Sequence, residues 1–197
     1  LFFIVIKCFN KKVVFDFYDA IYTTHELDPL SRVALIKNRI KDRFIKTVSC
    51  SNLILVENKL TEEYISKYNS NILIITGPID TSRYLPILKK DKKDIIIGWI
   101  GSPSTTMYFE NIYPVFAKIL KNFTNVYFKA IGASSMNFSG INIIQSSWNL
   151  ETEVSELQEF DIGIMPLRDD EWTRGKGGYK LLQYMAIGIP SIASPVG

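Results

Sequence analysis

The sequence predicts an α/β fold, in which helices cover parallel sheets. Short apolar runs alternate along the chain with segments whose apolar residues have helical spacing, as expected for strand–helix repeats. The run at 161–167 is apolar almost throughout, which is typical of a strand buried on both faces of a parallel sheet covered by helices. A charged stretch without periodicity separates two such series, so we expect two α/β units.

The first half of the chain predicts three strands and two helices. A strand from Lys12 ends in acidic residues, and the apolar spacing of the segment Pro29–Thr47 is helical. The other predicted elements are a strand at Asn52–Val56, a helix at Thr61–Tyr68 and a strand at Ile72–Ile75. Because strands and helices alternate, we expect an α/β sheet here.

Residues 77–93 indicate a domain boundary, because they contain glycine, proline and the charged run KKDKKD without a periodic apolar face. A second series of elements follows. Its predicted strands are Ile95–Ile100, Val126–Ile131, Ile141–Ile144, Asp161–Leu167 and Ser191–Ser194, and its predicted helices are Met107–Asn122, Glu151–Gln158 and Gly178–Ile187. The two series show no tandem repeat, so we interpret them as separate α/β units.

Composition and charge exclude several classes of protein. The 197 residues carry 23 basic and 20 acidic side chains, and a net charge of +3 is too small for a nucleic-acid surface, which has a clustered excess. Cys8 and Cys50 indicate neither a disulfide framework nor a zinc site, and we expect buried free thiols in a reducing compartment.

The apolar start LFFIVI is too short to cross a bilayer. The first residue is not Met and the last lies just after a predicted strand, so we expect a fragment of a larger protein.

The loop before the last helix is predicted to bind phosphate. It carries Arg174 and Lys176, then Gly177 and Gly178, whose backbone N–H groups an anion can approach without side-chain obstruction. The following helix directs its positive N-terminal end to the same place, and Lys180 lies in its first turn. Arg174 can grip phosphate oxygens with a planar fork, whereas the lysines supply point charges. The alternative for each lysine is a solvated surface position.

A second glycine turn follows the predicted strand Ile95–Ile100. Gly101 and Ser102 lie between this strand and a helix, where doubly wound sheets bind a phosphate or a sugar. The spaced glycines of a dinucleotide fingerprint are missing. A plain tight turn is therefore the alternative interpretation, with Ser102 capping the helix.

The ordered set of motifs resembles the retaining GT-B glycosyltransferases of group 1, also called family 4. The closing run DIGIMPL…WTRGKGGYKLLQYMAIGIPSIASPVG resembles the donor half of these enzymes, and GWIGSPST resembles the first strand and turn of that half. Upstream, VVFDFYDAIY, SNLILVENKLTEEYISKY and NILIITGPIDTSRYLP resemble the end of the acceptor half and its crossover. The resemblance covers nearly the whole chain in the family's order.

This resemblance implies two Rossmann-like domains of GT-B type, each with a parallel sheet and flanking helices, both incomplete here. Residues 1–80 would be the C-terminal part of the acceptor domain, 81–94 the linker, and 95–197 a truncated donor domain. The implied reaction moves a sugar from a nucleotide-diphosphate donor to a glycan or lipid-linked glycan with retention of configuration, without a cofactor or an essential metal. We expect the fragment to be inactive alone.

The resemblance also assigns the diphosphate contacts. Backbone donors of the family's glycine loop correspond to Gly177–Tyr179 here. Where the family has an arginine and a lysine after the first strand of the donor half, this chain has neither. We therefore expect Arg174, Lys176 and Lys180 to supply the positive charge from the other side of the crevice.

Two carboxylates of the family are missing. The family has a pair of glutamates across this loop and helix, the first contacting the donor sugar and the second the ribose; aligned on LLQYMA, they become Gly175 and Gln183. Gln183 keeps a predicted ribose contact, because an amide can hydrogen-bond a diol. Gly175 has no side chain for a sugar, so we expect Glu171 or Asp170 to reach in its place. Glu171 and Asp19 are our catalytic candidates.

Other positions are interpreted with their alternatives. Asp19 follows a strand and is predicted to contact the acceptor or the donor sugar, or else to form a turn or cap. Trp148 is predicted to stack on the nucleobase, or else to pack against a domain edge. His25 is interpreted as a surface residue. The three carboxylates at 169–171 lack the ligand pattern of a calcium loop, so we predict no metal site.

By resemblance, the protein would be cytoplasmic, would act in surface polysaccharide or lipopolysaccharide assembly, and would contact the inner face of the membrane. Its partners would be a nucleotide sugar and a glycan or lipid-linked acceptor, and no nucleic acid. Two other functions stay open. One is a non-catalytic nucleotide-sugar-binding relative, which the missing carboxylates allow, and the other is a flavodoxin-like scaffold, in which the phosphate loop would be incidental.

Overall fold

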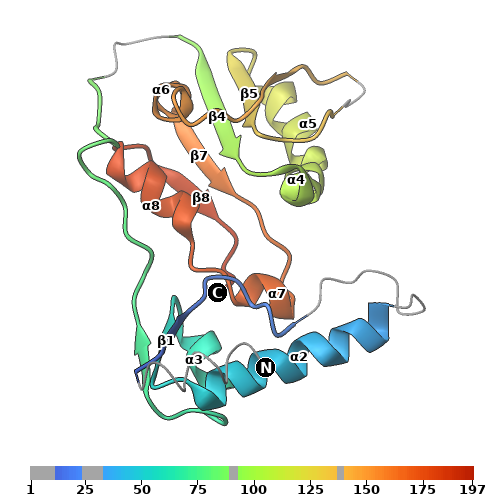
Figure 1. The fold of residues 1–197 in the computed structure, drawn as a ribbon. Helices are drawn as coiled ribbons and strands as arrows, with labels where there is room; N and C mark the ends of the chain where they lie inside the picture. The colour runs from blue at the N-terminus through green and yellow to red at the C-terminus, as the bar shows by residue number, and fades with distance from the viewer. Residues whose placement is uncertain (1–11, 24–32, 89–92, 137–139) are drawn as a thin grey trace. The chain divides into compact units, whose positions relative to one another are not determined.

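The computed structural model describes residues 12–23, 33–88, 93–136 and 140–197. These residues form two compact units (Figure 1). The first unit contains the chain up to Pro78 together with Asp169–Gly177 and Val196–Gly197, and the second contains Ile79–Arg168 and Gly178–Pro195. The predictions for Cys8 and His25 lie outside the described residues.

A three-stranded parallel sheet forms the centre of the first unit. Its strands are β1 (Val14–Asp16), β2 (Leu53–Val56) and β3 (Ile72–Ile74), in the order β1-β2-β3. Its helices are α2 (Val33–Cys50), α3 (Lys59–Ile65) and the short α7 (Glu171–Arg174). In the register of this sheet, Ile54 pairs with Phe15 on one side and with Ile72 on the other.

Aromatic side chains fill the core of the first unit. Phe17 and Phe44 pack edge to face with ring centroids 5.1 Å apart, and Val48 and Ile54 are fully buried in the same cluster. Phe44 and Val48 lie one turn apart on α2, so one face of this helix covers the core. Cys50 is exposed, so the expectation of a buried thiol is wrong there, because Cys50 lies two positions after Val48 on the other side of the helix.

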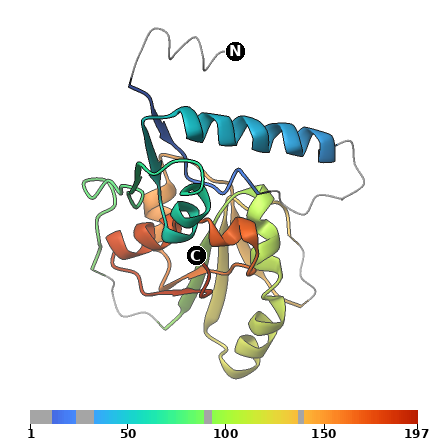
Figure 2. The same ribbon diagram turned by 90° about the horizontal axis from the view of Figure 1, so that it is seen from below.

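A five-stranded parallel sheet forms the second unit (Figure 1, and from below in Figure 2). Its strands are β4 (Ile95–Ile100), β5 (Val126–Ile131), β6 (Ile143–Ser146), β7 (Ile162–Met165) and β8 (Ser191–Ala193), in the order β6-β5-β4-β7-β8. Its helices are η1 (Pro103–Thr105), α4 (Thr106–Glu110), α5 (Tyr113–Asn122), α6 (Glu153–Gln158) and α8 (Tyr179–Ala186). The predicted bounds of β4 and β5 agree with the structure.

Helices cover both faces of this sheet, which explains its continuously apolar strands. Trp99 and Phe128 belong to a buried cluster with Phe116 of α5. Ile100, which follows Trp99 on β4, belongs to a separate cluster with Tyr184 of α8. Successive strand residues point to opposite faces, so the central strand β4 is apolar at consecutive positions.

One predicted helix is two helices. The segment Met107–Asn122 divides into α4 and α5, with Pro114 in the first turn of α5. Proline fits a first turn, but inside a continuous helix it would remove a backbone hydrogen bond and clash with the preceding turn. Within the described ranges, no helix combines the length and apolarity that a bilayer span requires.

Candidate functional site

The strand order of the second unit predicts a ligand crevice at the carboxyl ends of β4 and β7. After β4 the chain builds β5 and β6 on one side, and then returns to build β7 and β8 on the other. Open parallel sheets bind ligands at such a switch point, because the loops leaving the two strands diverge there. Gly101 and Ser102 follow β4 directly, so these two predicted phosphate residues lie at the switch-point edge, our name for the carboxyl ends of β4 and β7.

The start of α8 was predicted to bind an anion, and it lies in the second unit. Gly178 precedes the helix with a φ of 74°, a left-handed backbone conformation that residues other than glycine rarely adopt. No described side chain caps this end of the helix. The Lys180 ammonium lies over the ring of Trp99, 5.2 Å from its centroid. A Cβ atom on Gly101 would overlap that same ring. Lys180 and Gly101, predicted from separate motifs, therefore approach the same buried indole.

Polar contacts of the β4 turn support the alternative interpretation of Ser102. Its hydroxyl lies 3.0 Å from the hydroxyl of Ser104 and 3.2 Å from that of Thr105, within η1. The Gly101 N–H donates to the Ile131 carbonyl at 3.0 Å, as part of the sheet. The diphosphate contacts of Gly101 and Ser102 stay a prediction.

Trp148 and Gln183, predicted to contact the nucleoside, differ in exposure. Trp148 follows β6 and is 50% exposed, whereas Gln183 of α8 is only 5% exposed. The Trp148 Nε1–H donates to Glu153 Oε2, and Gln183 Nε2 donates to the hydroxyl of Tyr84 at 3.0 Å. Trp148 thus presents a ring surface, while the Gln183 amide belongs to a buried network.

Arg174, the residue predicted to grip phosphate, forms an ion pair within the first unit. Its Nε and Nη2 donate to the two carboxylate oxygens of Asp169 at 2.6 and 3.1 Å. These hydrogen bonds lower the pKa of the Asp169 carboxyl. The geometry arises from α7, whose first turn is capped by Asp170, since its carboxylate accepts the Thr173 N–H at 2.8 Å. Arg174 thus makes the two-pronged contact predicted for phosphate, but with the carboxylate of Asp169.

The next part of the loop is held by residues near β1 and β2 of the same unit. Lys176 Nζ lies 3.2 Å from Asp19 Oδ1. The Glu57 carboxylate accepts a hydrogen bond from the Gly177 N–H, one of the predicted phosphate donors. A side chain at Gly177 would overlap Glu57, so the glycine is required for this approach. Asn58 Nδ2 donates to the carbonyl oxygens of Arg174 and Lys176, at 3.3 Å each.

Glu57 and Asn58 of this cluster are not among the residues predicted from the sequence, and Glu57 is the charged one of the two. It directly follows β2, and Asp16 ends the neighbouring parallel strand β1, so both carboxylates lie at one edge of the sheet. Its place after a predicted strand was the signal that could have found it. Burial, and then repulsion from Asp19, raises the pKa of the Glu57 carboxyl above its ordinary value.

Replacing Glu57 with glutamine should change the pH dependence of unfolding. A carboxyl whose pKa is raised by folding contributes stability below its unfolded pKa and loses it as pH rises through the folded pKa. The thermal midpoint of Glu57→Gln minus that of wild type should therefore be more positive at pH 7 than at pH 4. Glu63→Gln, an exposed glutamate of the same unit, is the matched control. A Glu57 difference that is the same at both pH values would contradict this role.

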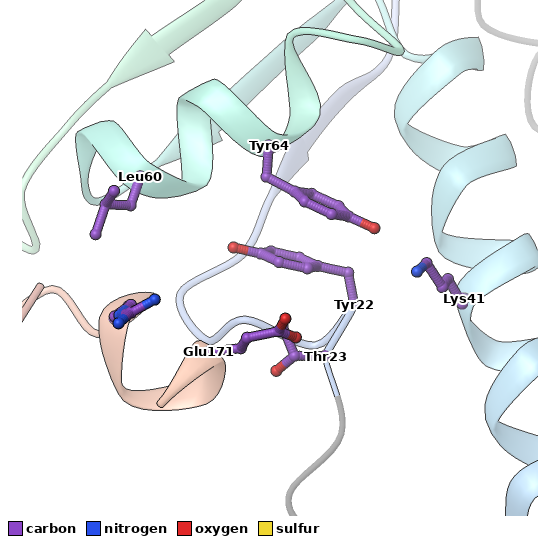
Figure 3. A pocket seen from close by; sticks show the side chains of 7 residues that line it. Tyr22, Thr23, Lys41, Leu60, Tyr64 and Glu171 are labelled. Carbon is purple, nitrogen blue, oxygen red and sulfur yellow. The ribbon is translucent and has the colours of Figure 1, made fainter. Parts of the chain in front are cut away.

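Glu171, predicted as a catalytic residue, lines a pocket in the first unit (Figure 3). The cavity has a volume of about 250 Å³, and Arg174, Lys41 and Thr23 also line it. Figure 3 shows the ring of Tyr22 beneath that of Tyr64, and the two are stacked with centroids 3.9 Å apart. An aromatic wall with a few charged and hydroxyl groups is a lining suited to a polar small molecule such as a sugar.

The side chains that invited a metal interpretation have other partners. Asp169 pairs with Arg174, and Asp170 caps α7. Among the described residues, no group of histidine, cysteine, aspartate and glutamate side chains is arranged to hold a metal ion.

The structure groups the predicted site residues by unit. Those of the second unit are Gly101, Ser102, Trp148, Gly178, Tyr179, Lys180 and Gln183. Those of the first unit are Asp19, Glu171, Arg174, Lys176 and Gly177. The loop segment Asp169–Gly177, which the sequence analysis placed with the second half, packs within the first unit.

Comparison with solved structures identifies the fold. The structure of TarM matches 94% of this chain with a TM-score of 0.67 and 15% sequence identity. The pneumococcal O-GlcNAc transferase GtfA, solved in complex with UDP and GlcNAc, matches 94% of the chain with a TM-score of 0.63 and 14% identity. The chain has the GT-B glycosyltransferase fold. The predicted α/β fold class, with parallel sheets and flanking helices, is confirmed.

The GT-B match extends to a further solved complex. A variant of S. aureus TarM in complex with Fondaparinux, alpha-GlcNAc-glycerol and UDP matches 94% of the chain with a TM-score of 0.66 and 14% identity. The chain spans 36% to 38% of the length of these three solved structures. No family model matches the sequence, and no curated protein matches it either.

Proposed function

We propose that the intact protein is a glycosyltransferase that moves a sugar from a nucleotide-diphosphate donor to a glycan or lipid-linked glycan with retention of configuration. The observation that carries this proposal is the convergence at the switch-point edge, where Lys180 lies over Trp99 beside Gly101. Negative charge develops on a diphosphate as the bond to the sugar breaks, and a fixed cation with a helix N-terminus stabilises it. The GT-B fold and the UDP complexes of the matched structures support a nucleotide sugar as donor.

In this proposal the donor is bound mainly by the second unit. The first backbone N–H groups of α8, at Gly178 and Tyr179, and the Lys180 ammonium bind the diphosphate. The exposed ring of Trp148 stacks on the base. Arg174 and Lys176 stay predicted diphosphate residues, and both cations are paired with carboxylates in the first unit.

The acceptor is assigned to the first unit. Our candidate for its binding place is the pocket beside Glu171, where charged and hydroxyl groups adjoin the stacked tyrosines. Asp19 is paired with Lys176, and in this proposal it contacts the sugar after releasing that lysine. A lipid-linked acceptor would bring a cytoplasmic protein to the inner face of the membrane, as the family resemblance implies.

Nucleotide binding and turnover by the intact protein test this function. UDP should raise the thermal unfolding midpoint, because a ligand that binds only the folded state stabilises it. Comparing the midpoint shifts with UDP, GDP and ADP identifies the base that the protein prefers. Release of UDP from UDP-GlcNAc in the presence of a glycan acceptor reports sugar transfer. Turnover should persist in EDTA, since the proposed diphosphate site uses cations of the protein. Absence of any shift with all three nucleotides would overturn the assignment.

A non-catalytic nucleotide-sugar-binding relative is the second candidate, and two observations favour it. Gly175 stands where the family has a carboxylate, and a Cβ at this position would overlap Ala20. Gln183, at the other carboxylate position, is buried and donates to Tyr84. Binding of UDP-GlcNAc without release of UDP would select this candidate over the enzyme.

A further inference from the structure

A buried carboxylate of the second unit connects the two residues predicted to contact the nucleoside. Glu153 opens α6, and the Trp148 Nε1–H donates to its Oε2. Gln183 Nε2, from α8, lies 3.4 Å from its Oε1. Trp148 and Gln183 were predicted from different motifs, and Glu153 was predicted by neither. One carboxylate therefore holds both side chains.

Two more donors from the described residues approach this carboxylate. The hydroxyl of Tyr84 donates to Glu153 Oε1, and Arg83 Nη2 lies 3.5 Å from the same oxygen. Burial, and then the hydrogen bond to Glu153, raises the pKa of Tyr84 to about 12, so its hydroxyl keeps its proton at neutral pH. A carboxylate accepts at both oxygens, whereas a glutamine would turn an NH₂ group toward a donor.

The polar groups around Glu153 are buried, whereas the side chain of Trp148 is half exposed. Glu153, Tyr84 and Gln183 are 6%, 3% and 5% exposed, whereas Trp148 is 50% exposed. The Cβ of Trp148 would lie 3.1 Å from a Cβ atom on Gly132, the residue that follows β5. Trp148 is thus anchored by its N–H at the carboxyl end of the sheet, with half of its surface open.

We propose that Glu153 is a positioning residue that fixes the indole of Trp148 as the stacking surface for the base of the donor. This inference rests on the proposed function. Glu153 acts through the Trp148 N–H and touches no ligand, and it sets the Gln183 amide by the same carboxylate. An indole held in one orientation loses less side-chain entropy when a base stacks on it, so fixing the ring strengthens binding.

Two probes separate this role from general stability. UDP carries a base and a diphosphate, whereas inorganic pyrophosphate carries only the phosphate groups. In the intact protein, Trp148→Ala should weaken UDP binding about tenfold, since stacking on an aromatic ring contributes roughly that much per base. Glu153→Gln should weaken UDP binding severalfold. Neither change should alter the affinity for pyrophosphate.

A double-mutant cycle tests whether Glu153 acts through the indole N–H. Trp148→Phe keeps an aromatic ring but has no N–H for the carboxylate. Adding Glu153→Gln to Trp148→Phe should therefore cost less UDP affinity than Glu153→Gln costs in the wild type. Glu151→Gln, an exposed glutamate two residues before Glu153, is the matched control and should bind UDP as the wild type does.

The outcomes distinguish the two proposals. If the wild type binds none of UDP, GDP and ADP, the proposed function fails, and the positioning role fails with it. If the wild type binds UDP and Glu153→Gln binds it equally well, only the positioning role is overturned. An equal loss of UDP and pyrophosphate binding in Glu153→Gln, or a fully additive cycle, also overturns it. Trp148→Ala leaves the buried carboxylate in place, so it tests the stacking surface even if Glu153→Gln does not fold.

Discussion

Replacing Lys180 with glutamine should weaken UDP binding by the intact protein roughly 10- to 100-fold. The Lys180 ammonium lies over the ring of Trp99 beside Gly101 at the switch-point edge, next to the N-terminus of α8. A hydrogen bond to a charged group contributes about 1.5–3 kcal/mol, which corresponds to that range of affinity. The change removes the charge and keeps a polar side chain of similar reach, so the loss reports the cation itself.

Titration calorimetry of UDP and of pyrophosphate measures this effect. Both ligands should lose affinity, because Lys180 acts on the phosphate groups and not on the base. The loss should shrink as salt concentration rises, since salt screens the attraction between partly exposed charges. Lys121→Gln, at the end of α5, is the matched control. Unchanged affinity for both ligands would remove Lys180 from the diphosphate site and leave the backbone of α8 as its main donor.

The substitution Phe128→Ala should destabilise the protein by about 3–5 kcal/mol. Phe128 lies at the centre of β5 and has no exposed surface. Its ring packs against that of Phe116, with centroids 4.1 Å apart, on the face that α5 covers. Alanine would leave a cavity between strand and helix that the surrounding side chains fill only in part.

Thermal unfolding with circular dichroism measures this loss. For a unit of this size the midpoint should fall by at least about 10 °C. Tyr127→Ala is the matched control, because it removes a neighbouring aromatic residue from the same strand, one that is 42% exposed. Its midpoint should change much less. If both variants lose equal stability, the loss reflects strand propensity. The packing of Phe128 against Phe116 would then not be its main cause.

The strands and helices were largely predictable because their signals are local. Apart from Lys129, the residues of β4 and β5 form apolar runs, and the predicted bounds of both strands match the structure. The break between α4 and α5 was also local, since Pro114 marks it. The helix prediction was too long because apolar spacing was weighed above the proline.

The partners of the charged residues were not predictable in the same way. Arg174 was predicted as a cation directed at phosphate, and the structure pairs it with Asp169. Lys176 pairs with Asp19, which lies 157 positions away in the sequence. Periodicity carries no information about such pairs, because many carboxylates could meet a given lysine and only chain packing selects one.

The sequence by itself determined that glycine turns follow two strands of a parallel sheet, and it predicted that they bind phosphate: Gly101 follows β4, and the glycine loop leads into α8, whose first turn carries Lys180. These signals depend on residue type and backbone conformation, as the φ of 74° at Gly178 illustrates. Only the tertiary structure decided which carboxylates contact the predicted site residues. Glu57 accepts the Gly177 N–H, and Glu153 lies between Trp148 and Gln183. The physical reason is that a buried carboxylate is stable only where several donors converge, and donors from distant segments converge only after the strands have paired.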